Sequence, residues 1–167
     1  MIVGYEIALA IPPDIPGILA LQDANQPDRG GILSVRFPHK WIQAAIANEA
    51  IVVARRGGKI AGYVVSGELS AQAHVPVVQA MIRAYAPPPN TYLYGPICVA
   101  QSERGRGLAG ALFDALRARF PGRDSITFIR RDNQVSRRAH AKMGMTEVAA
   151  FVHEGVEQMV VFGSNST

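Results

Sequence analysis

A glycine-rich turn before an amphipathic helix constrains this sequence more than any other feature. The stretch CVAQSERGRGLAG spans residues 98–110, and its last six residues match the pattern G-x-G-x-x-G. The segment 107–120 carries apolar residues at helical spacing and is followed by Pro-Gly, which predicts a helix that ends there. The chain must therefore place a strand, a tight turn and a helix in that order.

The turn also has the chemistry of an anion-binding site. Gly105, Gly107 and Gly110 allow a sharp backbone turn and let a ligand approach main-chain N–H groups. The first N–H groups of a helix lack intrahelical partners, and the helix dipole is positive at that end. Arg104 and Arg106 add positive charge. These features favour a phosphate or pyrophosphate ligand, with a plain strand-to-helix turn as the alternative.

Two other ligands fit parts of this pattern. A dinucleotide site would use Asp132, about twenty residues beyond the turn, as its ribose-binding acid. Against it, four polar residues (101–104) separate the strand from the first glycine, and either Asp132 or Asn133 is needed as a helix cap. RNA binding is supported only by R-G-R-G and the formal net charge of +4, without an aromatic-rich strand pattern. The pyrophosphate interpretation is therefore preferred.

The remaining hydrophobic patterns predict a mixed α/β fold. Strands are expected over 4–10, 50–56, 59–68, 91–100, 125–131, 146–154 and 157–163. Helices are expected over 14–25, where Asp14 would be the cap, and over 39–49, 73–86, 107–120 and 133–144. Gly57-Gly58 predicts a hairpin turn, and Gly95-Pro96 predicts a bulge or splay within its strand. We expect one α/β domain over residues 1–167, of mixed α+β character, with a mostly antiparallel, splayed sheet of about six to seven strands flanked by about four helices.

Composition excludes several classes of protein. Hydrophobic residues make up 49% of the chain and charged residues 18%, which suits a folded core rather than a disordered chain. The single cysteine, Cys98, excludes an internal disulfide, and no Cys/His spacing matches a zinc site, so we expect no metal. The N-terminus lacks a basic signal-peptide start, and no apolar stretch approaches about 20 residues. We expect a cytoplasmic protein with no membrane or nucleic-acid partner.

Two motifs in the sequence resemble the GNAT superfamily of acyl-CoA-dependent N-acyltransferases. The central motif of that family is a strand, R/Q-x-x-G-x-G/A and a helix, which residues 104–109 fit. The family's second motif, N-x-x-S-x-x-x-Y-x-K-L-G-F, resembles residues 133–145, with His140 for tyrosine, Met143 for leucine and Met145 for phenylalanine. The predicted order of strands and helices also resembles the family fold over nearly the whole length.

The resemblance implies acetyl-CoA, or another acyl-CoA, as acyl donor. Its implied function is N-acetyl transfer to a primary amine of an unidentified small molecule, peptide or protein. The alternatives are a non-catalytic acyl-CoA-binding module of the same fold and, less favoured, a dinucleotide-binding enzyme. Backbone groups of Ile97–Val99 would bond the pantetheine arm, the turn would hold the pyrophosphate, and Asn133 would contact the pantetheine region. The implied cofactor-binding residues are Ile97, Cys98, Val99, Arg104, Gly105, Arg106, Gly107, Leu108, Ala109, Gly110, Asn133, Ser136 and His140.

Acyl transfer to an amine requires a lost amine proton, a polarised thioester and a protonated leaving thiolate. The resemblance makes His140, in the place of the family's tyrosine, the candidate general acid, against the alternative of a solvated helix histidine. Glu68 is the candidate general base, against an exposed strand-end charge, and Tyr94 and His74 are weaker candidates. Cys98 is predicted to be a buried small residue rather than a nucleophile.

The resemblance also indicates where acceptor choice would arise. In this family it usually comes from the segments that correspond to residues 26–40 and 152–158. Arg29 and Arg36 would favour an acceptor with a carboxylate or phosphate, and Gly30-Gly31 would allow the first segment to move. A homodimer is a candidate assembly.

Overall fold

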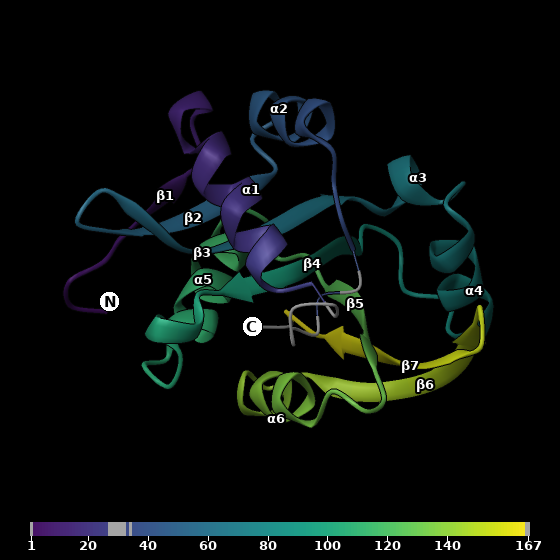
Figure 1. The fold of residues 1–167 in the computed structure, drawn as a ribbon. Helices are drawn as coiled ribbons and strands as arrows, with labels where there is room; N and C mark the ends of the chain where they lie inside the picture. Colours follow the sequence, from purple (N-terminus) through teal and green to yellow (C-terminus); the bar gives the residue numbers. More distant parts are fainter. Residues whose placement is uncertain (1, 27–32, 34, 166–167) are drawn as a thin grey trace. The chain divides into compact units, whose positions relative to one another are not determined.

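The computed structural model describes residues 2–26, 33 and 35–165, and Figure 1 shows how their helices and strands are arranged. The strands are β1 (Glu6–Leu9), β2 (Ile51–Arg56), β3 (Lys59–Glu68), β4 (Tyr92–Val99), β5 (Ser125–Arg130), β6 (Thr146–His153) and β7 (Val156–Gly163). The α-helices are α1 (Ile15–Ala24), α2 (His39–Ala47), α3 (Leu69–Gln72), α4 (Pro76–Ala84), α5 (Leu108–Ala118) and α6 (Gln134–Lys142).

The strands form one seven-stranded sheet in the order β1-β2-β3-β4-β5-β7-β6. The β1–β2, β2–β3, β5–β7 and β6–β7 ladders are antiparallel, and the β4–β5 ladder is parallel. This confirms the predicted mostly antiparallel α/β sheet. The described residues contain six α-helices, which are the five predicted by residue range and the short α3, which was not predicted. The expectation of about four helices was therefore too low. By packing, the chain divides into two compact units, Met1–Val65 with Pro96–Arg119 and Ser66–Gly95 with Phe120–Thr167.

In the first unit, helices cover both faces of β2 and β3. Side chains of α1 and α2 pack with Val53 and Tyr63 in one buried cluster. On the other face, α5 approaches β3 at Gly62, where an added Cβ would lie 3.1 Å from Leu112 Cδ1 and 3.0 Å from the Cys98 carbonyl oxygen. A side chain at this position would therefore crowd the contact between α5 and the sheet.

In the second unit, α4 packs on β5, β6 and β7. Val78 and Met81 of α4 share a buried cluster with Ile126 and Val160 of the strands. Val78 and Met81 are three positions apart, as on one face of a helix. Phe128 and Phe162 pack against the same cluster two positions beyond Ile126 and Val160, as on one face of a strand.

The first half of β4 shows the irregularity that Gly95-Pro96 predicts. Tyr92 and Leu93 pair in parallel with β5. Gly95 then adopts a φ of 110°, and an added Cβ there would lie 2.9 Å from Thr127 Oγ1. Only glycine fits this backbone conformation and this close approach, which confirms that the strand departs from regular geometry at the predicted place.

Asp14 occupies the N-cap position of α1, but the prediction that its side chain caps the helix is wrong. Its Oδ2 accepts the Ile11 N–H at 2.8 Å, closing the 3-10 turn Pro12–Asp14. Arg55 donates to both carboxylate oxygens, Nε to Oδ1 at 2.9 Å and Nη2 to Oδ2 at 2.6 Å. Burial alone would raise the pKa of Asp14, but the hydrogen bonds from Arg55 and Ile11 hold it below its ordinary value.

Asp14→Ala should lower the free energy of unfolding at pH 7 by about 2–3 kcal/mol, because the half-buried Arg55 guanidinium loses its buried carboxylate partner and keeps only the exposed Glu6. The folded-state pKa of Asp14 lies below its unfolded value of about 4, so its contribution is present above that pH and is lost as the pH falls through the folded value. Chemical denaturation of wild type and variant from pH 7 to about pH 2 should show their difference shrinking on the acidic side.

Asp23→Ala is the matched control, since Asp23 forms an exposed ion pair with Arg36. Asp23→Ala should lower the free energy of unfolding by less than about 0.5 kcal/mol. Equal losses for the two variants would contradict a special role for the Asp14–Arg55 pair.

Candidate functional site

The predicted anion site lies at the N-terminus of α5, in the first unit. Gly105 and Gly107 both have a φ of 78°, and Gly107 occupies the N-cap position without a side-chain cap. An added Cβ at Gly105 or Gly110 would meet no atom within 4 Å, and one at Gly107 would meet only Ile2 Cδ1, at 3.9 Å. Among the described residues the turn is therefore open, and none of their side chains competes for the N–H groups that begin α5.

Glu103 fixes the start of this turn. Tyr5 Oη donates to Glu103 Oε2, and Arg56 Nη1 donates to the same oxygen at 3.0 Å. The hydrogen bond from Tyr5 lowers the pKa of Glu103, with a further contribution from Arg56. The carboxylate is thus held by two residues of the first unit, which leaves it poorly suited to act as a base.

The two arginines of the turn have different surroundings. Arg104 Nη2 donates to Asn25 Oδ1 at 2.6 Å, and Arg104 Nε donates to the Val99 carbonyl oxygen at 3.4 Å. Arg106 is exposed, and its described interaction is the electrostatic one with Glu103. The predicted contact of Arg104 with a cofactor stays a prediction, and its guanidinium is already engaged with protein oxygens.

Ile97–Val99, the predicted arm-binding segment, form the end of β4 in the first unit. Cys98 is 3% exposed, and burial raises the pKa of its thiol to about 11. A thiol at such a pKa is protonated at neutral pH and a poor nucleophile. The structure therefore confirms a buried small residue at this position.

The second motif lies in the second unit, where Asn133 begins α6. Its Oδ1 accepts the Ser136 N–H at 3.1 Å, so Asn133 is the cap. Asp132 instead forms a two-bond ion pair with Arg130, at 3.0 and 2.9 Å. The residue that would have supported a dinucleotide site is thus bound to a neighbouring arginine.

His140 is 6% exposed on α6, so the alternative of a solvated histidine is wrong. Its Nδ1 lies 2.7 Å from the Ser136 carbonyl oxygen, and its ring stacks on Tyr94 at a centroid distance of 5.8 Å. A carbonyl only accepts, so Nδ1 carries a proton, and burial holds the pKa of His140 below its ordinary value. The neutral ring therefore has its lone pair at Nε2 and must gain a proton before it can donate one there.

The other candidate bases are constrained. Tyr94 Oη donates to Met145 Sδ at 2.9 Å, and burial raises the pKa of Tyr94 well above its ordinary value. Glu68 accepts two hydrogen bonds from Arg123, at 2.8 and 2.7 Å, which lower the pKa of Glu68. His74 is exposed in the link between α3 and α4. Tyr94 therefore stays a protonated phenol, which cannot serve as a base, and the Glu68 carboxylate takes up a proton less readily than usual. Their predicted roles remain predictions.

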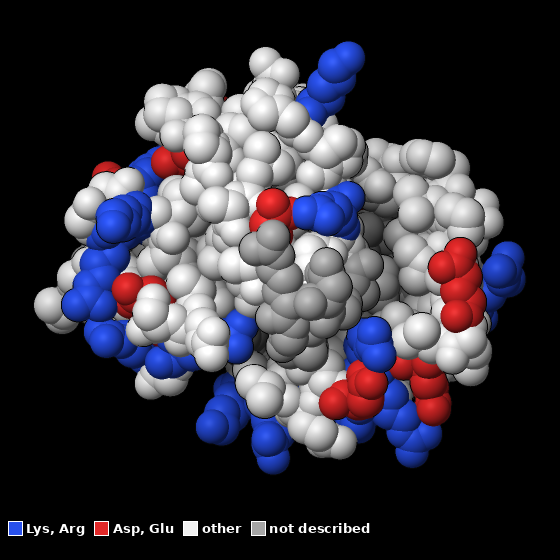
Figure 2. Space-filling model, viewed as in Figure 1, with Lys and Arg blue, Asp and Glu red and all other residues white. Residues whose placement is uncertain are grey.

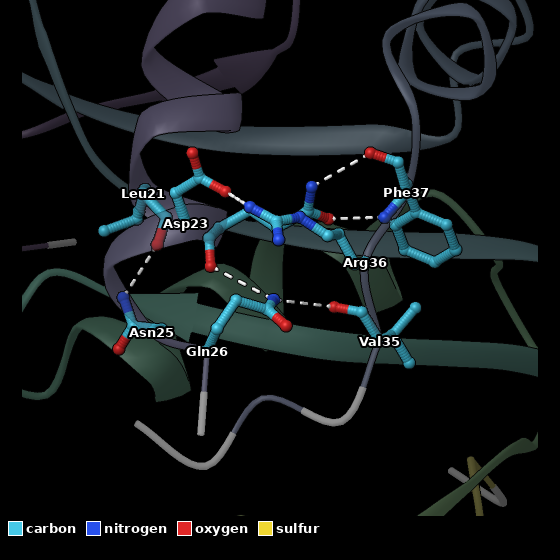
Figure 3. Close-up of polar contacts among 8 residues, drawn as sticks. Leu21, Asp23, Asn25, Gln26, Val35, Arg36 and Phe37 are labelled. Atoms are coloured by element: carbon cyan, nitrogen blue, oxygen red, sulfur yellow. Dashed lines mark hydrogen bonds and ion pairs between the residues drawn. The ribbon is translucent and has the colours of Figure 1, made fainter. Parts of the chain in front are cut away.

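The segment between α1 and α2, where acceptor choice was expected, is held by polar contacts at its ends (Figure 3). The side-chain amide of Gln22 donates to the Phe37 carbonyl at 2.9 Å and accepts the Phe37 N–H at 2.8 Å. Arg36 forms an ion pair with Asp23, so its charge is already met by a carboxylate. Arg29 and Gly30-Gly31 lie outside the described residues.

Basic and acidic side chains are interspersed on the face shown in Figure 2. Many of the arginines between residues 104 and 138 form ion pairs. These pairs include Arg119–Glu49, Arg123–Glu68, Arg130–Asp132, Arg131–Glu157 and Arg137–Glu147. Local pairing of this kind reduces the long-range attraction that an unpaired basic surface would exert on a polyanion.

Two kinds of feature are absent from the described part of the chain. Residues 2–26, 33 and 35–165 hold no group of three or more His, Cys, Asp or Glu side chains placed to bind a metal ion. Within the same residues, every helix is too short or too polar to cross a bilayer.

Comparisons with known proteins agree with the resemblance in the sequence. The sequence model of the Acetyltransferase (GNAT) family matches residues 18–145, and a search of curated protein sequences finds no match. A GNAT-family acetyltransferase from Streptococcus agalactiae 2603 has a TM-score of 0.76 and 18% identity, covering 100% of this chain and 99% of that one.

Two further solved structures share the fold. The yncA protein of Salmonella typhimurium, solved with acetyl-CoA, has a TM-score of 0.72 and 18% identity, covering 98% of this chain and 95% of that one. The ribosomal-protein-S18-alanine N-acetyltransferase of Escherichia coli has a TM-score of 0.69 and 12% identity, with coverage of 98% and 95%.

The state of His140 can be measured directly. Long-range 1H–15N spectra of histidine-labelled protein should show an Nδ1–H tautomer for His140 and a pKa below about 6.5. Because the folded-state pKa is lowered, stability should decline as the pH falls from about 6.5 through the folded value. The His140→Phe variant should lose less stability than wild type over this pH range. His39→Gln, at an exposed position, should lose as much stability as wild type. An Nε2–H tautomer would contradict the assignment.

Proposed function

The chain belongs to the GNAT acetyltransferase family, and on that basis we propose that it transfers an acetyl group from acetyl-CoA to a primary amine. The acceptor would be a small molecule, a peptide or a protein. The observation that carries the proposal is the open, uncapped, glycine-lined start of α5 directly after the end of β4. A site of this kind suits the pyrophosphate of a CoA ester.

The residues at the start of α5 fit this ligand. The N–H groups of Leu108, Ala109 and Gly110 would bond the pyrophosphate oxygens, since the α-helix offers them no partner. Side chains at Gly105 or Gly107 would narrow this space, and Arg106 adds a positive charge beside it. Backbone groups of Ile97–Val99 would bond the arm that leads from the pyrophosphate to the thioester.

The chemistry assigned to the chain is general acid–base and electrostatic catalysis. A backbone N–H near Val99 would polarise the thioester carbonyl. The amine nitrogen then forms a bond to the acyl carbon, and the carbon–sulfur bond breaks. His140, neutral with a lone pair at Nε2, would take the amine proton and return it to the thiolate sulfur. This assignment keeps the predicted acid role of His140 and explains how the residue acquires its proton.

The same proposal retains three predictions from the sequence. Residues 1–167 would act as one catalytic domain, the protein would be cytoplasmic, and its partners would be an acyl-CoA and an amine, with a homodimer as a candidate assembly. Glu68 remains a candidate base only if its ion pair with Arg123 opens during the reaction.

Acetyl-CoA should raise the melting temperature of the protein by several degrees at about 100 times its Kd, while NAD should not. The reason is that only the folded state presents the start of α5 as a binding site. Differential scanning fluorimetry with each ligand measures the shift. No shift with acetyl-CoA well above micromolar concentrations would refute the proposal, and a shift with NAD alone would favour a dinucleotide-binding enzyme.

Gly107→Val should abolish acetyl-CoA binding, because the new side chain stands at the cap of α5 where the backbone must approach the ligand. Gly58→Val is the matched control, with a φ of 79° against 78° and open surroundings, so both variants bear the same backbone strain. Isothermal titration should separate them. Equal affinities for acetyl-CoA in the two variants would exclude this turn as the site.

His140→Phe should lower kcat by about 100-fold or more with little change in acetyl-CoA affinity, because it removes proton transfer and keeps the ring volume. Thiol release against a panel of amines, amino acids, polyamines and peptides supplies an acceptor for the assay. Wild-type kcat/KM should fall as the pH drops through the lowered pKa of His140. Identical pH profiles in wild type and variant would remove His140 from the reaction.

A further inference from the structure

The turn before α5 carries two arginines that are two residues apart and differently bound. Arg104 donates from Nη2 to Asn25 Oδ1 at 2.6 Å and from Nε to the Val99 carbonyl at 3.4 Å. Arg106 forms no hydrogen bond to another described residue, although both arginines are exposed to solvent. In this motif Arg104 is therefore hydrogen-bonded to protein oxygens, whereas the Arg106 guanidinium is available to a ligand.

The acceptor of the shorter bond is itself fixed. Asn25 is 7% exposed at the end of α1, and its Nδ2 donates to the Leu21 carbonyl at 2.9 Å (Figure 3). Its own carbonyl accepts the Leu33 N–H at 3.0 Å. Because every described polar group of the Asn25 side chain is engaged, Oδ1 is a preorganised acceptor that cannot follow the arginine if the arginine turns toward a ligand.

The two hydrogen bonds of Arg104 occupy the part of its guanidinium that is suited to binding phosphate. Nε and Nη2 form one of the forked edges with which arginine binds phosphate through two parallel hydrogen bonds. In Arg104 both atoms of that edge donate to protein oxygens, one at the end of α1 and one at the end of β4. A phosphate on this edge would have to displace a buried asparagine and a main-chain carbonyl.

We propose that Arg104 is a positioning residue, which fixes the anion-binding turn to the ends of α1 and β4, and that Arg106 is the arginine that meets the anion. The inference rests on the proposed function, because the anion in question is the pyrophosphate of an acyl-CoA. Arg104 then supports binding through Asn25, by holding Gly105 and Gly107 where the N–H groups of α5 remain open.

The test is a double-mutant cycle with acetyl-CoA as the probe, followed by isothermal titration at about 0.05 and 0.5 M salt. Arg104→Gln and Asn25→Ala should each weaken binding by about 5–10-fold, and the double variant by no more than about 10-fold, because both break the same tether. These losses should be the same at both salt concentrations.

Two further variants separate charge from geometry. Arg104→Lys keeps the charge but lacks the forked edge, so it should lose about as much affinity as Arg104→Gln. Arg106→Gln should weaken binding by about 3–5-fold at low salt, with most of that loss gone at high salt. Arg117→Gln, an exposed arginine within α5 and away from the turn, is the matched control and should bind as wild type does.

The outcomes are distinguishable. Salt-dependent loss in Arg104→Gln with full affinity in Asn25→Ala would show that Arg104 binds the ligand directly and would overturn the inference. The inference would also be overturned if the affinity losses of the two single variants multiplied in the double variant. It would be overturned as well if Arg104→Gln and Asn25→Ala lowered the melting temperature but bound acetyl-CoA as tightly as wild type. If the wild type itself binds no acetyl-CoA, the proposed function fails. In that case the melting temperatures of the two single variants and the double variant test the contact between Arg104 and Asn25. Additive shifts in melting temperature would show that the two residues are not coupled and would refute the inference.

Discussion

The close approach of α5 to the sheet at Gly62 is the constraint on which the candidate site depends. Leu108 and Leu112 lie over this glycine, and a Cβ would sit 3.0 Å from the Cys98 carbonyl. The position of α5 follows from this packing, and with it the place where its unpartnered N–H groups begin. Since cores resist overpacking, an added methyl group would force the two leucine side chains or the β4 backbone to give way by a few tenths of an ångström.

In the second unit, burial rather than charge sets the chemistry of α6. The Ser136 carbonyl holds the Nδ1 proton of His140, and the Tyr94 ring covers one face of the imidazole. No carboxylate is described beside the ring to favour its protonated form, so desolvation dominates and the neutral form prevails. A tyrosine at this place would be a donor at neutral pH, whereas this histidine is first an acceptor.

The sequence predicted the elements well because most of them are set by local patterns. Apolar spacing, the Gly57-Gly58 turn and the Gly95 irregularity depend on neighbouring residues, and each appears in the structure at its predicted place. The short α3 was missed because Leu69–Gln72 is too brief to show a helical period. Asp14 was misassigned because its decisive partner, Arg55, is 41 residues away.

The side-chain partners within the site were harder to predict for the same reason. Arg104 and Asn25 are 79 residues apart, and Glu68 and Arg123 are 55 apart. A motif identifies which residue types occupy a turn, but only the fold brings a distant asparagine to one arginine and none to the next. Pairing across the fold therefore decides which charges of a motif remain available to a ligand.

The two helices of the motifs begin in different ways, and the contrast bears on function. At α6, the Asn133 side chain bonds the Ser136 N–H and so uses a donor that a ligand could have taken. At α5, Gly107 has no side chain to do this. Glycine at a cap costs only a few tenths of a kcal/mol relative to asparagine, because water can solvate the exposed N–H groups instead. The open start of α5 thus lowers the stability of the fold only slightly, and it leaves the N–H donors of the turn available to an anion.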